Sequence, residues 1–481
     1  MSLTKKTLTG LSWSFFDNFS KLSINFFIGI VLARLLSPFE FGLIGMATIL
    51  IAISNSFIDS GFSTALLNKK DCTKIDFETV FYFNLLSGCI FYLILFFSAG
   101  LISDFFNEPQ LKSIIQVLGI GLIINSLTIV QRIKLIKKID FKRQAKISVI
   151  SSIGSGIVGI WMAFKDYGVW SLVIKTILEY SITSGLLWSW GKWKPSFNFS
   201  VRSFKEMRSF AYKLLLYDLI ETTYNNIYLL IIGKYFSVVE LGYYTRADRF
   251  KNLPSQDITG IVRRVSYPVL ASMQDDISRL RIAYQNLIKS TMLVTFFLMF
   301  MMSATAESLT ILLIGQNWLP SVIYLQLLCF VGMFYPLQTL NLNIISIKSR
   351  GDLLIKLQFF NKFFSIPFII LGIFLGIKMM IIGMIIHSFI SYCLNSFSSG
   401  KLIGYPIIHQ IKDISPAFFI SLIAGLITYL TGIILPIPYA WKLLTQISIG
   451  ALIFIIFQEE KKTKEYLFIK NIIIDKIKGK E

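Results

Sequence analysis

The segment from residue 245 to residue 268, TRADRFKNLPSQDITGIVRRVSYP, concentrates side chains that could bind a charged ligand. It carries five cations and two carboxylates, yet it lies between two strongly apolar regions. On a helix of 3.6 residues per turn, one arc collects Arg246, Arg249, Gln256, Asp257, Gly260, Arg263 and Arg264. Lys251 lies off this arc, and Pro254 should kink the helix. Because cations outnumber acids, the arc predicts an anion-binding surface suited to phosphate or an acidic sugar.

Two other segments present polar faces with helical spacing. The first includes Asp17, Asn18, Lys21 and Asn25, and the second includes Lys213, Tyr217, Glu221, Tyr224 and Tyr228, with Asp218 and Asn225 at its margin. A polar cavity would explain all three faces, so Lys21 and Lys213 join the arginines as predicted substrate-binding residues. An alternative is that these charges only lock helices together. The i, i+4 spacing would allow Asp17 to pair with Lys21, and Lys175 with Glu179.

The elements that carry these residues must be membrane helices. Of the 481 residues, 54% are hydrophobic and 15% are charged, and the mean hydropathy is +0.66. This composition predicts an all-α, polytopic membrane protein. We predict about 14 spans of membrane-crossing length. They cover residues 11–36, 40–66, 77–103, 110–133, 146–164, 168–190, 207–233, 239–272, 285–313, 319–347, 354–377, 379–400, 415–434 and 437–457.

The net charge of +20 follows this topology. With both termini in the cytoplasm, most of the 47 Lys and Arg lie in cytoplasmic segments, as the positive-inside rule requires. A nucleic-acid partner is therefore not expected. Basic segments such as RIKLIKKIDFKRQAK could also lie on anionic headgroups, although the topological role is favoured. The four cysteines and two histidines show no paired or metal-type spacing, so no disulfide framework, metal site or cofactor is predicted.

An internal repeat divides the chain. Residues 33–47, ARLLSPFEFGLIGMA, match residues 233–247, GKYFSVVELGYYTRA, and residues from 132 resemble those from 343. The repeat pairs the apolar span 40–66 with the polar segment 239–272, which we therefore interpret as a span. It predicts two related six-helix lobes, two further spans and a basic cytoplasmic tail. These domains occupy residues 1–195, 196–403, 404–458 and 459–481.

Four segments resemble the Wzx-type flippases, the polysaccharide-exporter branch of the multidrug/oligosaccharidyl-lipid/polysaccharide (MOP) flippase superfamily. They are GYYTRADRFKNLP, VSYPVLASMQDD, LLSPFEFGLIGMA and IDFKRQA, and the match runs in order through nearly the whole chain. The resemblance implies two six-helix lobes around a central cavity, with the last two spans outside it. It also implies a multi-pass protein of the bacterial cytoplasmic membrane. Partners would be a lipid-linked oligosaccharide, membrane lipids and the polysaccharide polymerase machinery.

The activity implied by the resemblance is alternating access. Such a protein would carry an undecaprenyl-pyrophosphate-linked oligosaccharide, a unit of O-antigen, capsule or exopolysaccharide, from the cytoplasmic to the outer leaflet. Cavity cations would bind the pyrophosphate and acidic sugars, here Arg246, Arg249 and Arg263. Some relatives couple transport to H⁺ or Na⁺, for which Asp17, Asp218 and Glu221 are the candidates.

Three other functions remain open at this point. A drug or small-cation antiporter of the same fold would be expected to have an acidic or aromatic cavity rather than surplus cations. A membrane enzyme of polysaccharide assembly, such as a polymerase or ligase, would need a sizeable outer loop or a carboxylate cluster, and the longest predicted loops are short and cytoplasmic. A scaffold would bind partners without moving lipid. The sequence predicts no catalytic residue.

Overall fold

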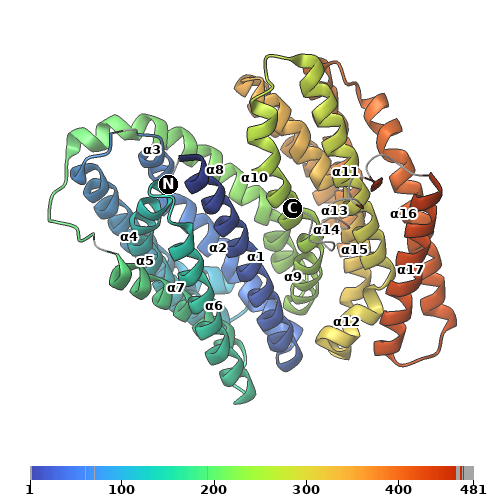
Figure 1. Cartoon of the computed structure of the whole chain (residues 1–481). Coiled ribbons are helices and arrows are strands. Elements are labelled where there is room, and N and C mark those ends of the chain that lie inside the picture. The colour runs from blue at the N-terminus through green and yellow to red at the C-terminus, as the bar shows by residue number, and fades with distance from the viewer. Residues whose placement is uncertain are drawn as a thin grey trace. The chain divides into compact units, whose positions relative to one another are not determined.

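Two compact units make up the chain, Met1–Gly242 and Tyr243–Glu481 (Figure 1). The computed structural model describes residues 3–59, 61–69, 71–191, 193–461, 466, 467 and 470, with side chains from Trp13 onward except Ser14 and Phe15. Most of the predicted tail 459–481 lies outside the described residues. The division into lobes of six and six spans, followed by two further spans, remains a prediction that rests on the internal sequence repeat.

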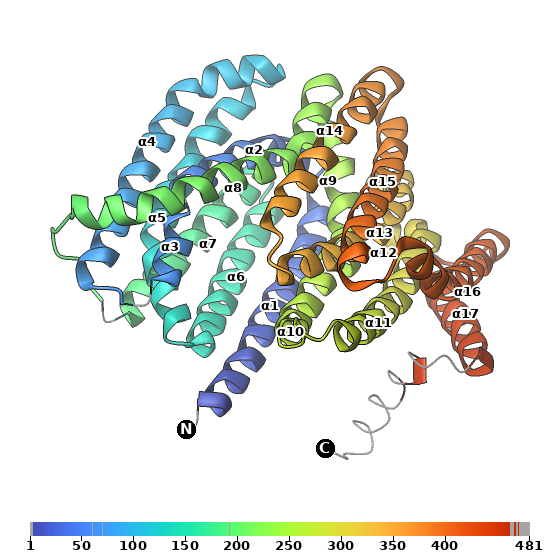
Figure 2. The same ribbon diagram turned by 90° about the horizontal axis from the view of Figure 1, so that it is seen from above.

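Helices alone build the first unit in its described part. They are α1 (Leu3–Leu35), α2 (Pro38–Asp59), α3 (Phe62–Asn68), α4 (Lys74–Phe106), α5 (Gln110–Lys137), α6 (Phe141–Phe164), α7 (Val169–Trp190), α8 (Val201–Tyr235) and the start of α9 (Val238–Asn252). The closest packing joins α4 to α5, α1 to α6, and α6 to α7. Helix α8 lies along α2, as Figure 2 shows.

The second unit begins inside α9, and its described secondary structure is also helical. Its elements are the π-helical turn η1 (Leu253–Asp257), α10 (Ile258–Ala271), α11 (Ile277–Ala304), α12 (Ala306–Ile314), the 3₁₀ turn η2 (Gln316–Trp318), α13 (Ser321–Ile347), α14 (Gly351–Leu375), α15 (Ile377–Ile403), α16 (Ile407–Ile434) and α17 (Tyr439–Lys461). Helix α13 packs on α15, and α14 also packs on α15. Of the last two helices, α16 packs along α11, and α17 packs along α16.

Among the described residues, 11 helices are long and apolar enough to cross a membrane. The prediction of an all-α, multi-pass membrane protein is therefore confirmed. Three of the predicted spans fall outside this set, namely α7, α8 and the segment formed by α9, η1 and α10. These helices carry many of the polar residues that the sequence singles out, which lowers their hydropathy. The total of about 14 membrane spans remains a prediction.

Several predicted spans are broken in the structure, each at an identifiable residue. Span 40–66 is two helices, since Gly61 adopts a left-handed backbone with φ of 68° between α2 and α3. Span 285–313 is interrupted at Thr305, between α11 and α12. In span 239–272 the kink predicted at Pro254 takes the form of the π-helical turn η1, because proline has no N–H for the helical ladder.

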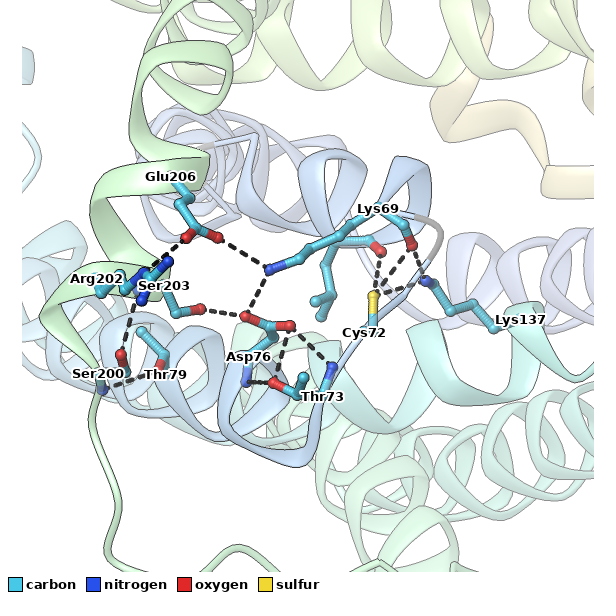
Figure 3. A network of polar contacts seen from close by, with 11 residues as sticks. Lys69, Cys72, Thr73, Asp76, Thr79, Lys137, Ser200, Arg202, Ser203 and Glu206 are labelled. Atoms are coloured by element: carbon cyan, nitrogen blue, oxygen red, sulfur yellow. Dashed lines mark hydrogen bonds and ion pairs between the residues drawn. The ribbon is translucent and has the colours of Figure 1, made fainter.

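A polar network fixes the beginning of α8 (Figure 3). The Ser200 hydroxyl caps the helix by accepting from the Ser203 N–H at 3.2 Å, and the Ser203 hydroxyl donates to Asp76 at the start of α4. The Lys69 ammonium lies 2.9 Å from an Asp76 oxygen and 3.3 Å from a Glu206 oxygen. The hydrogen bond to Asp76 raises the pKa of Lys69, and Glu206 adds to the effect. Helix α8 is thereby held against the linker that precedes α4.

A reciprocal glycine contact joins the beginnings of α2 and α9 within the first unit. A Cβ added to Gly42 would lie 1.9 Å from the Val238 carbonyl oxygen, and one added to Gly242 would lie 1.9 Å from the Pro38 carbonyl oxygen. Only glycine permits this approach of the two backbones. Because Gly42 and Gly242 are equivalent positions of the internal repeat, the two copies meet through the same contact made twice.

We predict that Gly42→Ala and Gly242→Ala both destabilise the protein. Alanine normally stabilises a helix relative to glycine, but here the added methyl group must displace backbone, at a cost of about 1–3 kcal/mol. The apparent melting temperature of purified protein in detergent would measure the loss. Gly100→Ala is the matched control, because no atom lies within 4 Å of its added Cβ. A Gly242 variant that melts at or above the parent temperature would contradict the close contact.

A second prediction concerns topology. In a variant lacking the four native cysteines, a cysteine at Gln316 should react with an impermeant thiol reagent added outside cells, whereas one at Ser349 should react only after permeabilisation. Both side chains are exposed, so reactivity reports the side of the membrane rather than burial. The reverse labelling would mean that residues 239–272 do not cross the membrane.

Candidate functional site

A cationic face runs along the segment formed by α9, η1 and α10. The side chains of Arg249, Gln256, Arg263 and Arg264 are exposed. Nothing lies within 4 Å of a Cβ placed on Gly260, so the backbone itself is open on this part of the segment. The structure thus gathers three of the predicted arc's cations on accessible positions, where they could bind an anion through forked guanidinium hydrogen bonds. The rest of the helix surface, outside this arc, is not fully buried, since the apolar side chain of Val265 is 67% exposed.

Arg246 occupies a different environment from the other arginines of the arc. Its guanidinium lies 5.7 Å from the centre of the Trp318 ring, and Trp318 is fully buried in η2. Tyr243 meets the same indole edge-on, with ring centres 6.2 Å apart. This geometry is a cation–π contact that joins α9 to η2 within the second unit. Any contribution of Arg246 to substrate binding would therefore be combined with a structural one.

Lys251 points away from the cationic face, as the sequence predicts. It is 6% exposed, and its ammonium lies 2.7 Å from an Asp248 oxygen. The other Asp248 oxygen accepts from the Asn252 amide at 2.9 Å. The aliphatic part of Lys251 packs so near Gly332 that a Cβ there would lie 3.0 Å from it. Lys251 and Asp248 therefore form an ion pair inside the second unit.

A separate polar cluster joins α1, α6 and α7 in the first unit. Glu179 is its centre, with one oxygen 3.0 Å from the Lys175 ammonium and the other 3.9 Å from that of Lys21. Lys175 also donates to Asn25 at 3.4 Å, and Ser152 donates to Glu179 at 3.3 Å. The pairing of Lys175 with Glu179 suggested by spacing is confirmed. The carboxylate that pairs with Lys21 is Glu179 and not Asp17, because α7 brings its acid against α1.

Asp17 lies near this cluster and is buried, with 6% of its surface exposed. It interacts electrostatically with Lys21 and with Arg132 of α5. Its Oδ1 atom has no hydrogen-bond partner among the described residues. Asp17 is thus a buried acid that lies among cations of the first unit. Sequence reasoning missed Arg132, although a cation inside the predicted span 110–133 is a signal that could have identified it.

Most of the predicted residues of α8 are accessible, but Tyr228 is buried. Lys213 and Asp218 are exposed, and Glu221 is half-buried with the Asn225 amide 3.4 Å from its carboxylate. Asp218 interacts electrostatically with Glu221 and with Asp59 at the end of α2. No group of three metal-ligating side chains occurs in the part of the chain that the structure describes. The arrangement is therefore an acidic patch beside an exposed lysine.

Known proteins resemble both the sequence and the fold. A family model described as polysaccharide biosynthesis protein matches residues 31–323. The lipopolysaccharide biosynthesis protein WzxC of Escherichia coli (strain K12) is 24% identical over 443 residues, which cover 90% of this chain and 89% of WzxC.

Two solved structures share the fold. The structure of the lipid II flippase MurJ in an inward closed conformation aligns with a TM-score of 0.75 at 17% identity, covering 97% of this chain and all of MurJ. An inward-facing multidrug resistance MATE family transporter of the MOP superfamily aligns with a TM-score of 0.63 at 15% identity, covering 80% of this chain and 95% of that one. The predicted resemblance is confirmed: the chain belongs to the polysaccharide biosynthesis protein family and has the fold of the MOP superfamily.

Proposed function

We propose that this protein is a flippase for an undecaprenyl-pyrophosphate-linked oligosaccharide, a unit of O-antigen, capsule or exopolysaccharide. It moves this lipid from the cytoplasmic to the outer leaflet of the bacterial cytoplasmic membrane, with both of its own termini in the cytoplasm. The observation that carries the proposal is the exposed cationic face with Arg249, Arg263 and Arg264. The names of WzxC and MurJ support the same class of substrate.

The physical argument starts from the cost of these cations in a membrane. An arginine at the bilayer centre costs about 2.5–3.5 kcal/mol even on lenient scales, so three of them do not face acyl chains. Water and an anion are the environment that such a face requires. Pyrophosphate meets this requirement, since guanidinium groups bind phosphate oxygens in pairs. Lys21 and Lys213 are the substrate-binding cations proposed in the first unit, and both side chains are exposed.

The proposed activity needs no bond to be made or broken. Flipping requires alternating access and a face that releases its ligand, so no catalytic residue is part of the proposal. A cation antiporter of the same fold is less well supported, because exposed arginines repel a cationic drug. Asp17, Asp218 and Glu221 remain the proposed sites for a coupling H⁺ or Na⁺. The polymerase machinery that consumes the flipped lipid is the proposed partner on the far side.

We predict that replacing Arg246, Arg249 and Arg263 together by Gln leaves membrane insertion near normal but blocks transport. Lipid-linked oligosaccharide should then accumulate in the cytoplasmic leaflet of a deletion strain that carries the variant. Replacement by Lys should keep part of the activity, because an ammonium attracts pyrophosphate without the two-pronged hydrogen bonds. Leaflet location of the lipid and export of surface polysaccharide are the measurements.

Two controls separate charge from structure in this experiment. Arg279→Gln removes an exposed arginine at the start of α11, away from the face, and should export normally. Arg249→Gln/Arg263→Gln spares the contact of Arg246 with Trp318 and should still fail to transport. Normal export by the triple variant at parental protein level would disprove the role of this face.

A further prediction distinguishes the lysines around Glu179. Lys175 is largely buried beside Glu179, so Glu179→Gln should leave it unpaired and cost roughly 3–5 kcal/mol. Lys21 is 49% exposed and 3.9 Å from Glu179, so Lys21→Gln should lower transport with little change in melting temperature. Melting in detergent and polysaccharide export would be measured for each variant. If Lys21→Gln melts early and Glu179→Gln does not, the assignment of the two roles is wrong.

A further inference from the structure

A cavity of about 250 Å³ lies in the first unit where α5 ends, α6 begins and α7 ends. Its lining combines a cationic part with an apolar part. The residues are Gln131, Lys134, Leu135, Lys138, Arg143, Ile147, Leu187, Gly191 and Trp193. The volume is small for a ligand site, so it suits a headgroup-sized molecule rather than a large one.

The chemistry of the lining favours an anion. Three of its residues are cations and none of those described is a carboxylate. The Lys134 ammonium lies 4.6 Å from the Phe77 ring centre and 4.8 Å from that of Trp193, which are cation–π contacts rather than ion pairs. Lys138 is exposed at the end of α5. The cavity therefore carries more positive charge than the neighbouring carboxylates neutralise.

One nearby acid pairs with a cation of the cavity, and another pairs with a lysine outside it. Asp140 lies 3.3 Å from Arg143, and Glu78 accepts from the Ser196 hydroxyl at 2.6 Å and pairs with Lys74 at 3.5 Å. The indole N–H of Trp193 is buried without a hydrogen-bond partner among the described residues. This donor belongs to a residue that lines the cavity, and the described residues supply no acceptor for it.

An apolar strip continues from this cavity along α6. Residues seven apart on a helix lie on nearly the same face, since two turns take about 7.2 residues. Arg143 therefore begins a line that runs through Ile150, Ile157 and Phe164. These three side chains are 44%, 63% and 65% exposed. A cationic cavity at one end of an exposed apolar face matches a molecule with a charged head and a hydrocarbon tail.

We propose that this cavity binds the phosphate headgroup of an anionic phospholipid, with an acyl chain lying along the exposed face of α6. Basic pockets among membrane helices commonly bind anionic headgroups. The apolar strip favours a lipid over a soluble phosphate, because a soluble phosphate has no hydrocarbon chain that could contact the strip. The proposal does not depend on the transported substrate, because the cavity is lined by residues of the first unit and the cationic face belongs to the second.

Native mass spectrometry of the full-length protein in detergent tests the proposal, with phosphatidylglycerol as the probe and phosphatidylcholine as the neutral comparison. Lys134→Gln/Lys138→Gln should weaken phosphatidylglycerol binding by roughly fivefold for each cation removed. The matched control is Lys146→Gln/Lys205→Gln, which removes two exposed lysines that do not line the cavity. Arg143→Gln is a second variant on α6, and the lipid-free melting temperature of each variant checks its folding.

The outcomes separate the possibilities. Selective loss of phosphatidylglycerol binding in the cavity variants, with the control unchanged, supports the proposal. Equal binding by the cavity double variant and the control, when both are folded, overturns it. Displacement of phosphatidylglycerol by glycerol 3-phosphate at equal concentration would also overturn it, because the site would then be one for a soluble phosphate.

Discussion

Hydrocarbon offers no hydrogen bonds, and this constraint governs where each polar group of the chain can lie. Backbone groups satisfy it by forming helices, the elements that make up the secondary structure of the described residues. Polar side chains satisfy it in one of two ways. Some find partners inside their own unit, and others lie on a face that must meet water, headgroups or a ligand. The division between these two groups is the basis for every functional statement about the protein.

Inside each unit, several polar side chains form sets of mutual partners. Lys175 with Glu179 holds α7, and Lys251 with Asp248 lies within the second unit. In the same unit the Asn341 amide donates to Gln410 at 3.3 Å, which joins α13 to α16 without any charge. Removing one member of such a set would leave a buried group unsatisfied, so these contacts stabilise the helix arrangement rather than bind substrate.

The second group includes cations that the units leave accessible, and two clusters of them have different surroundings. The face of α9, η1 and α10 interrupts its helix with a π-helical turn, a feature that often marks functional segments. The cavity at the ends of α5, α6 and α7 instead adjoins an apolar helix face. Positive charge alone does not separate a transport surface from a lipid site. The neighbouring apolar surface suggests which ligand each one suits.

The sequence alone determined the helical membrane class, most of the apolar spans, the internal repeat and the segment that bears the cationic face. These features follow from composition and helical period, which are local properties. Tertiary structure decided which helices meet. It paired Lys21 with Glu179, placed Arg246 against Trp318, and brought Lys134 and Arg143 to one cavity. A helical period assigns each side chain to a face of its own helix but does not name the neighbouring helix, because that choice depends on packing between segments distant in the chain.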